Sequence, residues 1–373
     1  MNKTVKLFNV ALNKWHYKNL KEVFLSSQIS KGYEIVKFEK NFSKFINNQN
    51  FKTTSDVSSS ILLSLLTIGI KPGDEILSNP LACISTNVPI VNMFAKPIWY
   101  DTKPFSSSPD IQSLKKNFSK KTKAIIVYHW GGNPVELNEI YTFARKKNIP
   151  VIEDAGEAFG STYSGKFLGN TGSDFSCFSF HAIRHITSIE GGGISCKLKR
   201  NIDLIDKIRR FGIDQKTFRD SLGEINSKSD VPVAGYNLYM NNLSANIANS
   251  QMSKISEKIK ISSSNGIYYD KNLKNIDNLK LYNYSNNSSS SFWVYTIFVH
   301  RPRDLILRLK KKGVQASQLH FRNDRYSVFK SNRNKKKLKN IDVFSKTSVS
   351  IPCGWWVNKK QIDYIIWAIK KGW

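Results

Sequence analysis

Short apolar runs alternate with segments of helical periodicity through the first two thirds of the chain. The run 149–152 ends in Glu153 and Asp154, and the run 175–180 ends in His181. Short apolar runs bounded by polar residues and glycine are typical of strands buried on both faces of a parallel sheet. Because ligands bind at the carboxyl ends of such strands, the polar residues after both runs predict a binding site.

The remaining pattern predicts one large and one small domain. Val36, Phe38, Phe42 and Phe45 recur at near-helical spacing and predict the buried face of a helix. The later elements follow in order: an apolar helix within 54–77, strand–loop–strand over 76–100, helix–strand–helix over 111–148, and a helix with a loop over 203–214.

The composition changes near residue 252, where a lysine- and serine-rich helix is expected. A strand at 292–299 is predicted to pair with 314–319 around a helix at 303–312. We therefore expect an α/β domain with a mainly parallel sheet over 1–250, and a smaller α+β domain over 251–373.

The net charge of +29 is extreme for 373 residues. The lysines are spread along the chain apart from a dense run at 333–339, and no recognisable nucleic-acid module accompanies them. Compositional drift, with some attraction for an anionic ligand, is favoured over a DNA- or membrane-binding role. The sequence holds no run of 18 apolar residues, no signal-peptide pattern and no metal-ligand spacing of its four cysteines, which predicts a cytoplasmic protein without a metal site.

Several motifs resemble one family. The segment 179–192 reads SFHAIRHITSIEGG, and 152–154 reads IED; HWGGNP, GYN, HFRND and IPCGWW occur farther along. These segments resemble the DegT/DnrJ/StrS-type nucleotide-sugar aminotransferases, which use pyridoxal phosphate and share the aspartate aminotransferase fold. The resemblance covers nearly the whole chain and implies a homodimer whose site lies at the subunit boundary.

The resemblance also implies roles for individual residues. Asp154 corresponds to the carboxylate that pairs with the pyridinium nitrogen of pyridoxal or pyridoxamine phosphate. Ser58 and Ser59, at a helix start, and Ser179 correspond to phosphate contacts, although Asp56 beside them is equally expected as an N-cap. The other correspondences place Cys83 where an aromatic residue stacks on the ring, Glu157 near the phenolic oxygen, Asn237 in the interface segment, and His129, His320, Arg322 and Trp355 near the substrate.

Arg184 stands where the family motif has the Schiff-base lysine. An arginine stays protonated and is neither a Schiff-base amine nor a ready base, so no internal aldimine is expected. His185 is a weak candidate base, because adjacent side chains of an extended segment point to opposite faces. Buried charges are normally paired, and Arg184 is expected to pair with Asp154 or Glu157.

Three functions stay open on the sequence alone. The first is a nucleotide-sugar aminotransferase or a close derivative acting in deoxysugar or surface-polysaccharide synthesis. The second is a non-catalytic homologue that binds a sugar nucleotide or a partner subunit. The third is a lysine-independent, dehydratase-like enzyme that uses His185 or His129 as its base.

Overall fold

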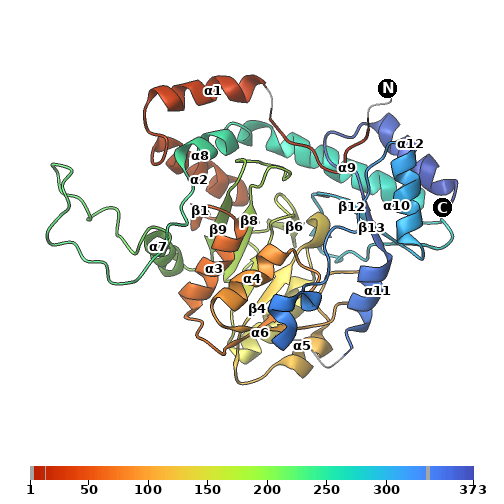
Figure 1. Cartoon of the computed structure of the whole chain (residues 1–373), viewed down its shortest axis with the longest axis horizontal. Helices are drawn as coiled ribbons and strands as arrows, with labels where there is room; N and C mark the ends of the chain where they lie inside the picture. Colours follow the sequence, from red (N-terminus) through yellow and green to blue (C-terminus); the bar gives the residue numbers. More distant parts are fainter. Residues whose placement is uncertain (1–3, 13, 333–336) are drawn as a thin grey trace.

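The computed structural model describes residues 4–12, 14–332 and 337–373, and part of the basic run 333–339 lies outside them. Its centre is a seven-stranded sheet in the order β1-β9-β8-β5-β4-β2-β3 (Figure 1). The strands are β1 (Phe51–Thr54), β2 (Glu75–Ser78), β3 (Lys96–Trp99), β4 (Thr122–Tyr128), β5 (Val151–Asp154), β8 (Phe175–Ser179) and β9 (Gly192–Cys196). The pairs from β3 through β8 are parallel, whereas β9 is antiparallel to both β8 and β1. The expected mainly parallel sheet is confirmed.

Helices cover both faces of this sheet because neighbouring strand residues point in opposite directions. Val127 and Phe178 pack on one face, and Ile126 and Cys177 pack on the other. The first face is covered mainly by α2 (Tyr33–Ile46), α6 (Leu137–Lys147) and α8 (Asn242–Asn249), and the second by α3 (Val57–Ile68), α4 (Ile84–Asn92) and α7 (Lys199–Ile208). Helix α1 (Lys14–Leu25) lies farther out, and α5 (Ile111–Asn117) contributes Leu114 to the buried cluster on the first face.

The buried face of α2 differs from the predicted one at two positions, because Ile35 replaces Val36 and Ile46 is buried where Phe45 is only partly buried. Ile35, Phe38 and Phe42 are fully buried, whereas Val36 is 62% exposed. The positions 35, 38, 42 and 46 keep the 3.6-residue period, and a face that includes residue 36 does not.

Helix α4 occupies a segment that the sequence pattern predicts as a loop. It contains Pro89 and several β-branched residues, which have low helix propensity. Tertiary contacts hold it in place: Asn87 Oδ1 accepts from the Ser78 hydroxyl at 2.5 Å, and its amide donates to the carbonyl of Asn79 at 3.0 Å. Packing therefore overrides local propensity here.

The C-terminal part has its own antiparallel sheet, ordered β10-β12-β13. Its strands are β10 (Leu279–Leu281), β12 (Tyr295–Val299) and β13 (Ser348–Ile351), and its helices are α9 (Ile255–Leu273), α10 (Pro302–Lys311), α11 (Lys339–Thr347) and α12 (Lys359–Lys370). The shorter elements are β6 (Thr162–Tyr163), β7 (Lys166–Phe167), β11 (Ser288–Ser289), η1 (Trp130–Gly132), η2 (Met252–Lys254), η3 (Asn323–Arg325) and η4 (Ser327–Asn332).

The predicted pairing of 292–299 with 314–319 is wrong, because β13 takes that place beside β12. The segment 314–319 makes only isolated bridges, from Val314 to Val5 and from Ser317 to Ser350. Leu319 then adopts a left-handed conformation, with φ of 63°, which ends the extended path. This segment delivers His320 to the cavity described below.

The N-terminal segment packs against the C-terminal part. Val5 belongs to the same buried cluster as Tyr295 and Val349, and Phe8 stacks on Trp293 with ring centroids 4.8 Å apart. The division into 1–250 and 251–373 stays a prediction, and this segment crosses it. Within the described residues, no helix is long and apolar enough to span a membrane.

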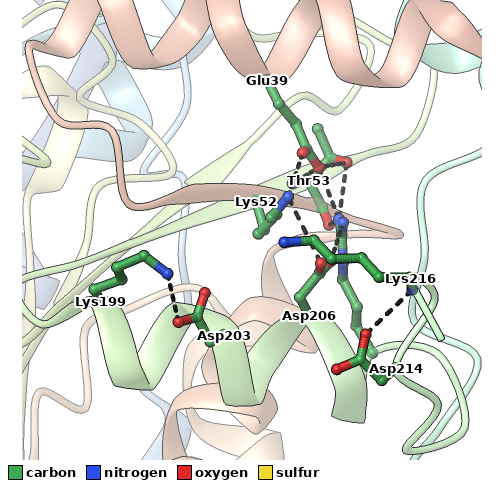
Figure 2. Close-up of polar contacts among 9 residues, drawn as sticks. Glu39, Lys52, Thr53, Lys199, Asp203, Asp206, Asp214 and Lys216 are labelled. Carbon is green, nitrogen blue, oxygen red and sulfur yellow. Dashed lines mark hydrogen bonds and ion pairs between the residues drawn. The ribbon is translucent and has the colours of Figure 1, made fainter.

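A buried ion network ties α2, β1 and α7 together. Arg209 Nη1 lies 2.8 Å from Glu39 Oε1, and Arg209 Nε lies 2.9 Å from Asp206 Oδ1. Figure 2 shows Glu39, Lys52, Thr53 and Asp206 gathered around one point between the two helices. Burial by itself raises the pKa of Glu39, but Arg209 and Lys52 outweigh it and lower that pKa overall.

Candidate active-site cavity

A cavity of about 440 Å³ lies beyond the carboxyl ends of the central strands. Its lining combines the start of α3, the start of α4, the turn after β8 and residues of the C-terminal part: Asp56, Val57, Ser58, Cys83, Ser85, Ser179, His181, Ile183, Arg184, Glu190, Gly191, Trp293, Ser317, Leu319 and His320, with Phe8 from the N-terminal segment. This volume is in the range of small-molecule sites. A larger hollow of about 700 Å³ borders α2 and α8, but none of the predicted site residues lines it.

Arg184 enters the cavity from the turn after β8, and its side chain is 12% exposed. Its Nη1 lies 3.4 Å from Glu157 Oε1, which confirms the expected pairing with that carboxylate. Its guanidinium carbon lies 4.0 Å from the ring centroid of Trp293, a cation–π distance. Its buried Nε has no hydrogen-bond partner among the described residues.

Glu157 is the buried group that joins the two sides of the cavity. Its Oε1 lies 2.9 Å from His320 Nε2, and its Oε2 accepts from the Gly131 N–H at 2.8 Å. Burial by itself raises the pKa of Glu157, but His320, Arg184 and the Gly131 N–H outweigh it and hold that pKa below its ordinary value. Glu157 is therefore an ionised carboxylate at neutral pH.

Asp154 sits behind the cavity at the end of β5. Its Oδ2 accepts from the Thr86 hydroxyl at 2.6 Å, and its Oδ1 accepts from the Gly156 N–H at 2.9 Å. Burial raises the pKa of Asp154, and these two hydrogen bonds only partly offset that rise.

Asp56 is the N-cap of α3, one of the two roles expected for it. Its carboxylate accepts from the Ser59 N–H at 2.9 Å and from the Ser59 hydroxyl at 2.8 Å. Ser59 is therefore turned toward Asp56, whereas Ser58 lines the cavity. The positive end of the α3 dipole thus already carries an anionic side chain.

Ser179 and Cys83 also line the cavity. Ser179 Oγ accepts from the His181 N–H at 3.4 Å, a long contact that leaves the hydroxyl available. Cys83 is half-buried at the start of α4 and makes no aromatic wall.

Besides Asp154, Glu157 and Ser59, five further candidates from the sequence do not line this cavity. His129 is buried with its Nε2 3.0 Å from Glu153 Oε2, and Arg322 is buried in ion pairs with Asp324 and Asp342. The other three lie elsewhere: Asn237 is exposed in the segment before α8, Trp355 lies under the side chain of Lys258, and His185 is buried.

His185 and His129 are thus not placed to act as bases in the cavity. His185 Nε2 lies 3.1 Å from the carbonyl oxygen of Ser291, and burial lowers the pKa of His185 to about 4. The segment 181–186 forms turns and bends rather than the expected extended strand. Even so, Arg184 faces the cavity and its neighbour His185 faces away.

Sequence reasoning missed Trp293 and Phe8. Both are aromatic residues near the edge of an apolar run, and only their long-range contacts reveal their role. Three non-glycine residues with positive φ directly precede cavity residues: Ile189 before Glu190, Phe292 before Trp293, and Leu319 before His320. Such strained backbone concentrates at functional sites.

These residues do not fit a lysine-linked cofactor. No lysine is among the described residues that line the cavity. Asp56 already occupies the N-terminus of α3, and the ionised Glu157 adds a buried carboxylate that contacts the two cavity residues Arg184 and His320. The cavity offers serine hydroxyls, one guanidinium and the imidazoles of His181 and His320 as ligand contacts.

Comparisons with known proteins agree with the motifs. The model of the DegT/DnrJ/EryC1/StrS aminotransferase family matches residues 11–370. A UDP-4-amino-4,6-dideoxy-N-acetyl-β-L-altrosamine transaminase of Campylobacter jejuni is 28% identical over 343 residues, which are 90% of this chain and 88% of that protein.

Two solved structures have the same fold over their full length. AtS13 of Actinomadura melliaura is 28% identical with a TM-score of 0.94 and covers 100% of both chains. CalS13, a sugar aminotransferase of Micromonospora echinospora, is 27% identical with a TM-score of 0.92, over 98% of this chain and 99% of that one. The chain therefore belongs to the DegT/DnrJ/EryC1/StrS aminotransferase family.

Proposed function

We propose that this chain binds a nucleotide-linked sugar in the cavity and does not carry out transamination through a lysine-bound cofactor. The observation that carries the proposal is Arg184, which occupies the motif position of the lysine and pairs with Glu157 at 3.4 Å. The family supports a sugar ligand, and the name of the Campylobacter relative supports a UDP-linked one.

The chemistry of arginine explains the second half of the proposal. A guanidinium keeps its proton at any physiological pH, so it offers no free amine to a carbonyl group. It remains suited to hydrogen bonding with a phosphate or carbonyl oxygen. Pyridoxal or pyridoxamine phosphate would then bind without a covalent link, held by Ser58 and Ser179.

The test is chemical trapping. The protein is incubated with pyridoxal phosphate, reduced with borohydride, digested and examined by mass spectrometry. We expect no reduced adduct on the peptide that contains residue 184. Arg184→Lys is expected to form that adduct, and Arg184→Met serves as the control that removes the charge without supplying an amine.

Adduct formation on a lysine of the unchanged protein, together with amino transfer, would overturn this proposal. Failure of Arg184→Lys to form the adduct would mean that Asp56 and Glu157 also obstruct the cofactor. That result would favour the non-catalytic, ligand-binding alternative.

We also propose a cytoplasmic homodimer. Four free cysteines support a reducing compartment. The segment between α7 and α8 supports the dimer, because it extends away from the rest of the chain and exposes apolar side chains (Figure 1). The net charge of +29 supports attraction of a nucleotide sugar, whose diphosphate is anionic.

A further inference from the structure

His320 is held in one orientation at the wall of the cavity. Its Nε2 lies 2.9 Å from Glu157 Oε1 and 3.0 Å from the Tyr128 hydroxyl. An ionised carboxylate accepts only, so it selects the tautomer with the proton on Nε2. Nδ1 is then the basic nitrogen, and it has no hydrogen-bond partner among the described residues.

The same carboxylate oxygen also holds Arg184. Glu157 Oε1 lies 3.4 Å from Arg184 Nη1, so a base and a fixed positive charge share one anchor. Both side chains line the same cavity, with His320 17% and Arg184 12% exposed. The unpartnered Nε of Arg184 leaves a buried donor whose hydrogen bond a ligand oxygen would complete.

The backbone around these groups limits their movement. The Gly131 N–H fixes the second oxygen of Glu157, and the Trp293 ring lies against the Arg184 guanidinium. Leu319, directly before His320, has φ of 63°, and neighbouring structure must maintain this unfavourable conformation. A base, an orienting carboxylate and a cation in fixed geometry are the groups that proton abstraction next to a carbonyl requires.

We propose that His320 is the general base of a cofactor-independent proton transfer on a nucleotide-linked keto sugar, with Arg184 stabilising the oxygen and Glu157 as the positioning residue. This activity rests on the proposed function, because it requires the sugar to bind in the cavity. His320 thus takes the role of base that was expected of His185 or His129.

The step is balanced without any other reactant. The C–H bond next to the carbonyl breaks, its proton moves to His320 Nδ1, and its electron pair forms a carbon–carbon double bond. The carbonyl oxygen takes up the negative charge, which the guanidinium of Arg184 stabilises. Return of a proton from His320 to the same face of the carbon regenerates the ketone with its configuration unchanged.

The experiment measures hydrogen exchange. The probe is a UDP-linked 4-keto-6-deoxy-N-acetylhexosamine, which carries a ketone where the Campylobacter relative's named sugar carries an amine. The full-length protein and probe are incubated in D₂O, and deuterium at the carbons beside the carbonyl is followed by mass spectrometry and NMR. Binding of the same probe is measured separately by calorimetry.

We expect exchange well above the rate in buffer. His320→Gln keeps a side-chain donor for Glu157 but has no basic nitrogen, and it is expected to slow exchange by about 100-fold or more while the probe still binds. Arg184→Met is expected to slow exchange by about 100-fold. His300→Gln, which changes an exposed histidine beyond β12, is the matched control and should exchange as the unchanged protein does.

Glu157→Gln separates positioning from packing. It is expected to lower the exchange rate at saturating probe more than it raises KM, because the imidazole remains but its tautomer is no longer fixed. A merely structural role would instead lower the amount of folded protein, measured by circular dichroism, without changing the rate per folded molecule.

The outcomes are distinct. Binding of the probe without exchange overturns this inference and leaves the proposed function standing. Absence of binding overturns both for this class of ligand. Undiminished exchange by folded His320→Gln also overturns the inference, and loss of exchange in that variant with retained binding supports it.

Discussion

At the scale of single residues, His185 shows how burial makes the stability of the fold depend on the protonation of one histidine. Its pKa is lowered from 6.5 to about 4 by burial, with a smaller contribution from the charge of Arg184. As the pH falls, His185 is therefore protonated near pH 6.5 in the unfolded chain but only near pH 4 in the folded chain. The contribution of neutral His185 to the free energy of unfolding is complete above about pH 6.5 and decreases as the pH falls from about 6.5 to about 4.

We expect the free energy of unfolding to fall by about 2 kcal/mol between about pH 7 and about pH 5 through His185. His185→Gln removes the titration and should flatten that slope, as measured by urea unfolding at both values. His300→Gln, at an exposed site, is the control. Glu39 and Glu157 have lowered pKa values, so their contributions are lost only below their ordinary range and do not obscure this window.

Residue-level prediction succeeded where the partners lie close in the chain or in a shared motif. The pairing of Arg184 with Glu157 follows from two polar residues placed at adjacent strand ends. The bond between Glu157 and His320 joins residues 163 positions apart, and no local pattern encodes it. The predicted substrate contacts of His129 and Arg322 were wrong. A motif identifies these residues but does not show that His129 is paired with Glu153 and Arg322 with Asp324.

At the scale of elements, the Arg209 network is the connection that fixes α2 and α7 to strand β1. Arg209→Met leaves Glu39 buried without its main partner, and we expect the free energy of unfolding to fall by about 3–5 kcal/mol. Chemical unfolding measures this loss. An unchanged midpoint would show that Lys52, 3.0 Å from Glu39, suffices alone.

The matched control lies on the same helix. Lys199 and Asp203 form an exposed i,i+4 pair at 2.7 Å, which Figure 2 shows beside the buried network. Lys199→Met should change the free energy of unfolding by less than about 0.5 kcal/mol, because exposed pairs contribute little. Both substitutions remove one positive charge from α7 or its C-terminal end. The difference between their effects on the free energy of unfolding therefore measures the effect of burial.

Elements with strong periodicity were predictable, and those that depend on distant contacts were not. The strands at 151–154 and 175–179 stand out as apolar runs that end in polar residues. Helix α4 was missed because Pro89 and its β-branched neighbours argue against a helix until packing is known. The predicted pairing of 314–319 with 292–299 was wrong because an apolar stretch does not show which strand it pairs with. Strand β13 pairs with β12 instead.

At the scale of the whole molecule, family and fold followed from motifs spaced over nearly the full length. The order of strands in the central sheet depends on crossovers that the sequence does not display. The net charge of +29, in contrast, follows directly from the composition and affects the interactions of the whole molecule. Its clearest physical consequence concerns self-association, because two copies of the chain repel each other.

We expect dimer formation to strengthen with salt. The described segment between α7 and α8 exposes Leu222 by 85% and Ile225 by 60%, and apolar contacts of this kind must overcome repulsion between chains of charge +29. Raising the salt from about 0.1 M to about 1 M shortens the screening length from about 10 Å to about 3 Å. Sedimentation equilibrium should show a larger dimer fraction at the higher concentration.

Two substitutions test whether this segment is the contact. Leu222→Asp combined with Ile225→Asp should shift the protein toward monomer, because each places a charge in an apolar interface. Leu307→Asp, at an exposed leucine on α10, is the control and should leave the dimer intact. A monomer at both salt concentrations would contradict the proposed homodimer, and an unchanged dimer in the double variant would place the contact elsewhere on the surface.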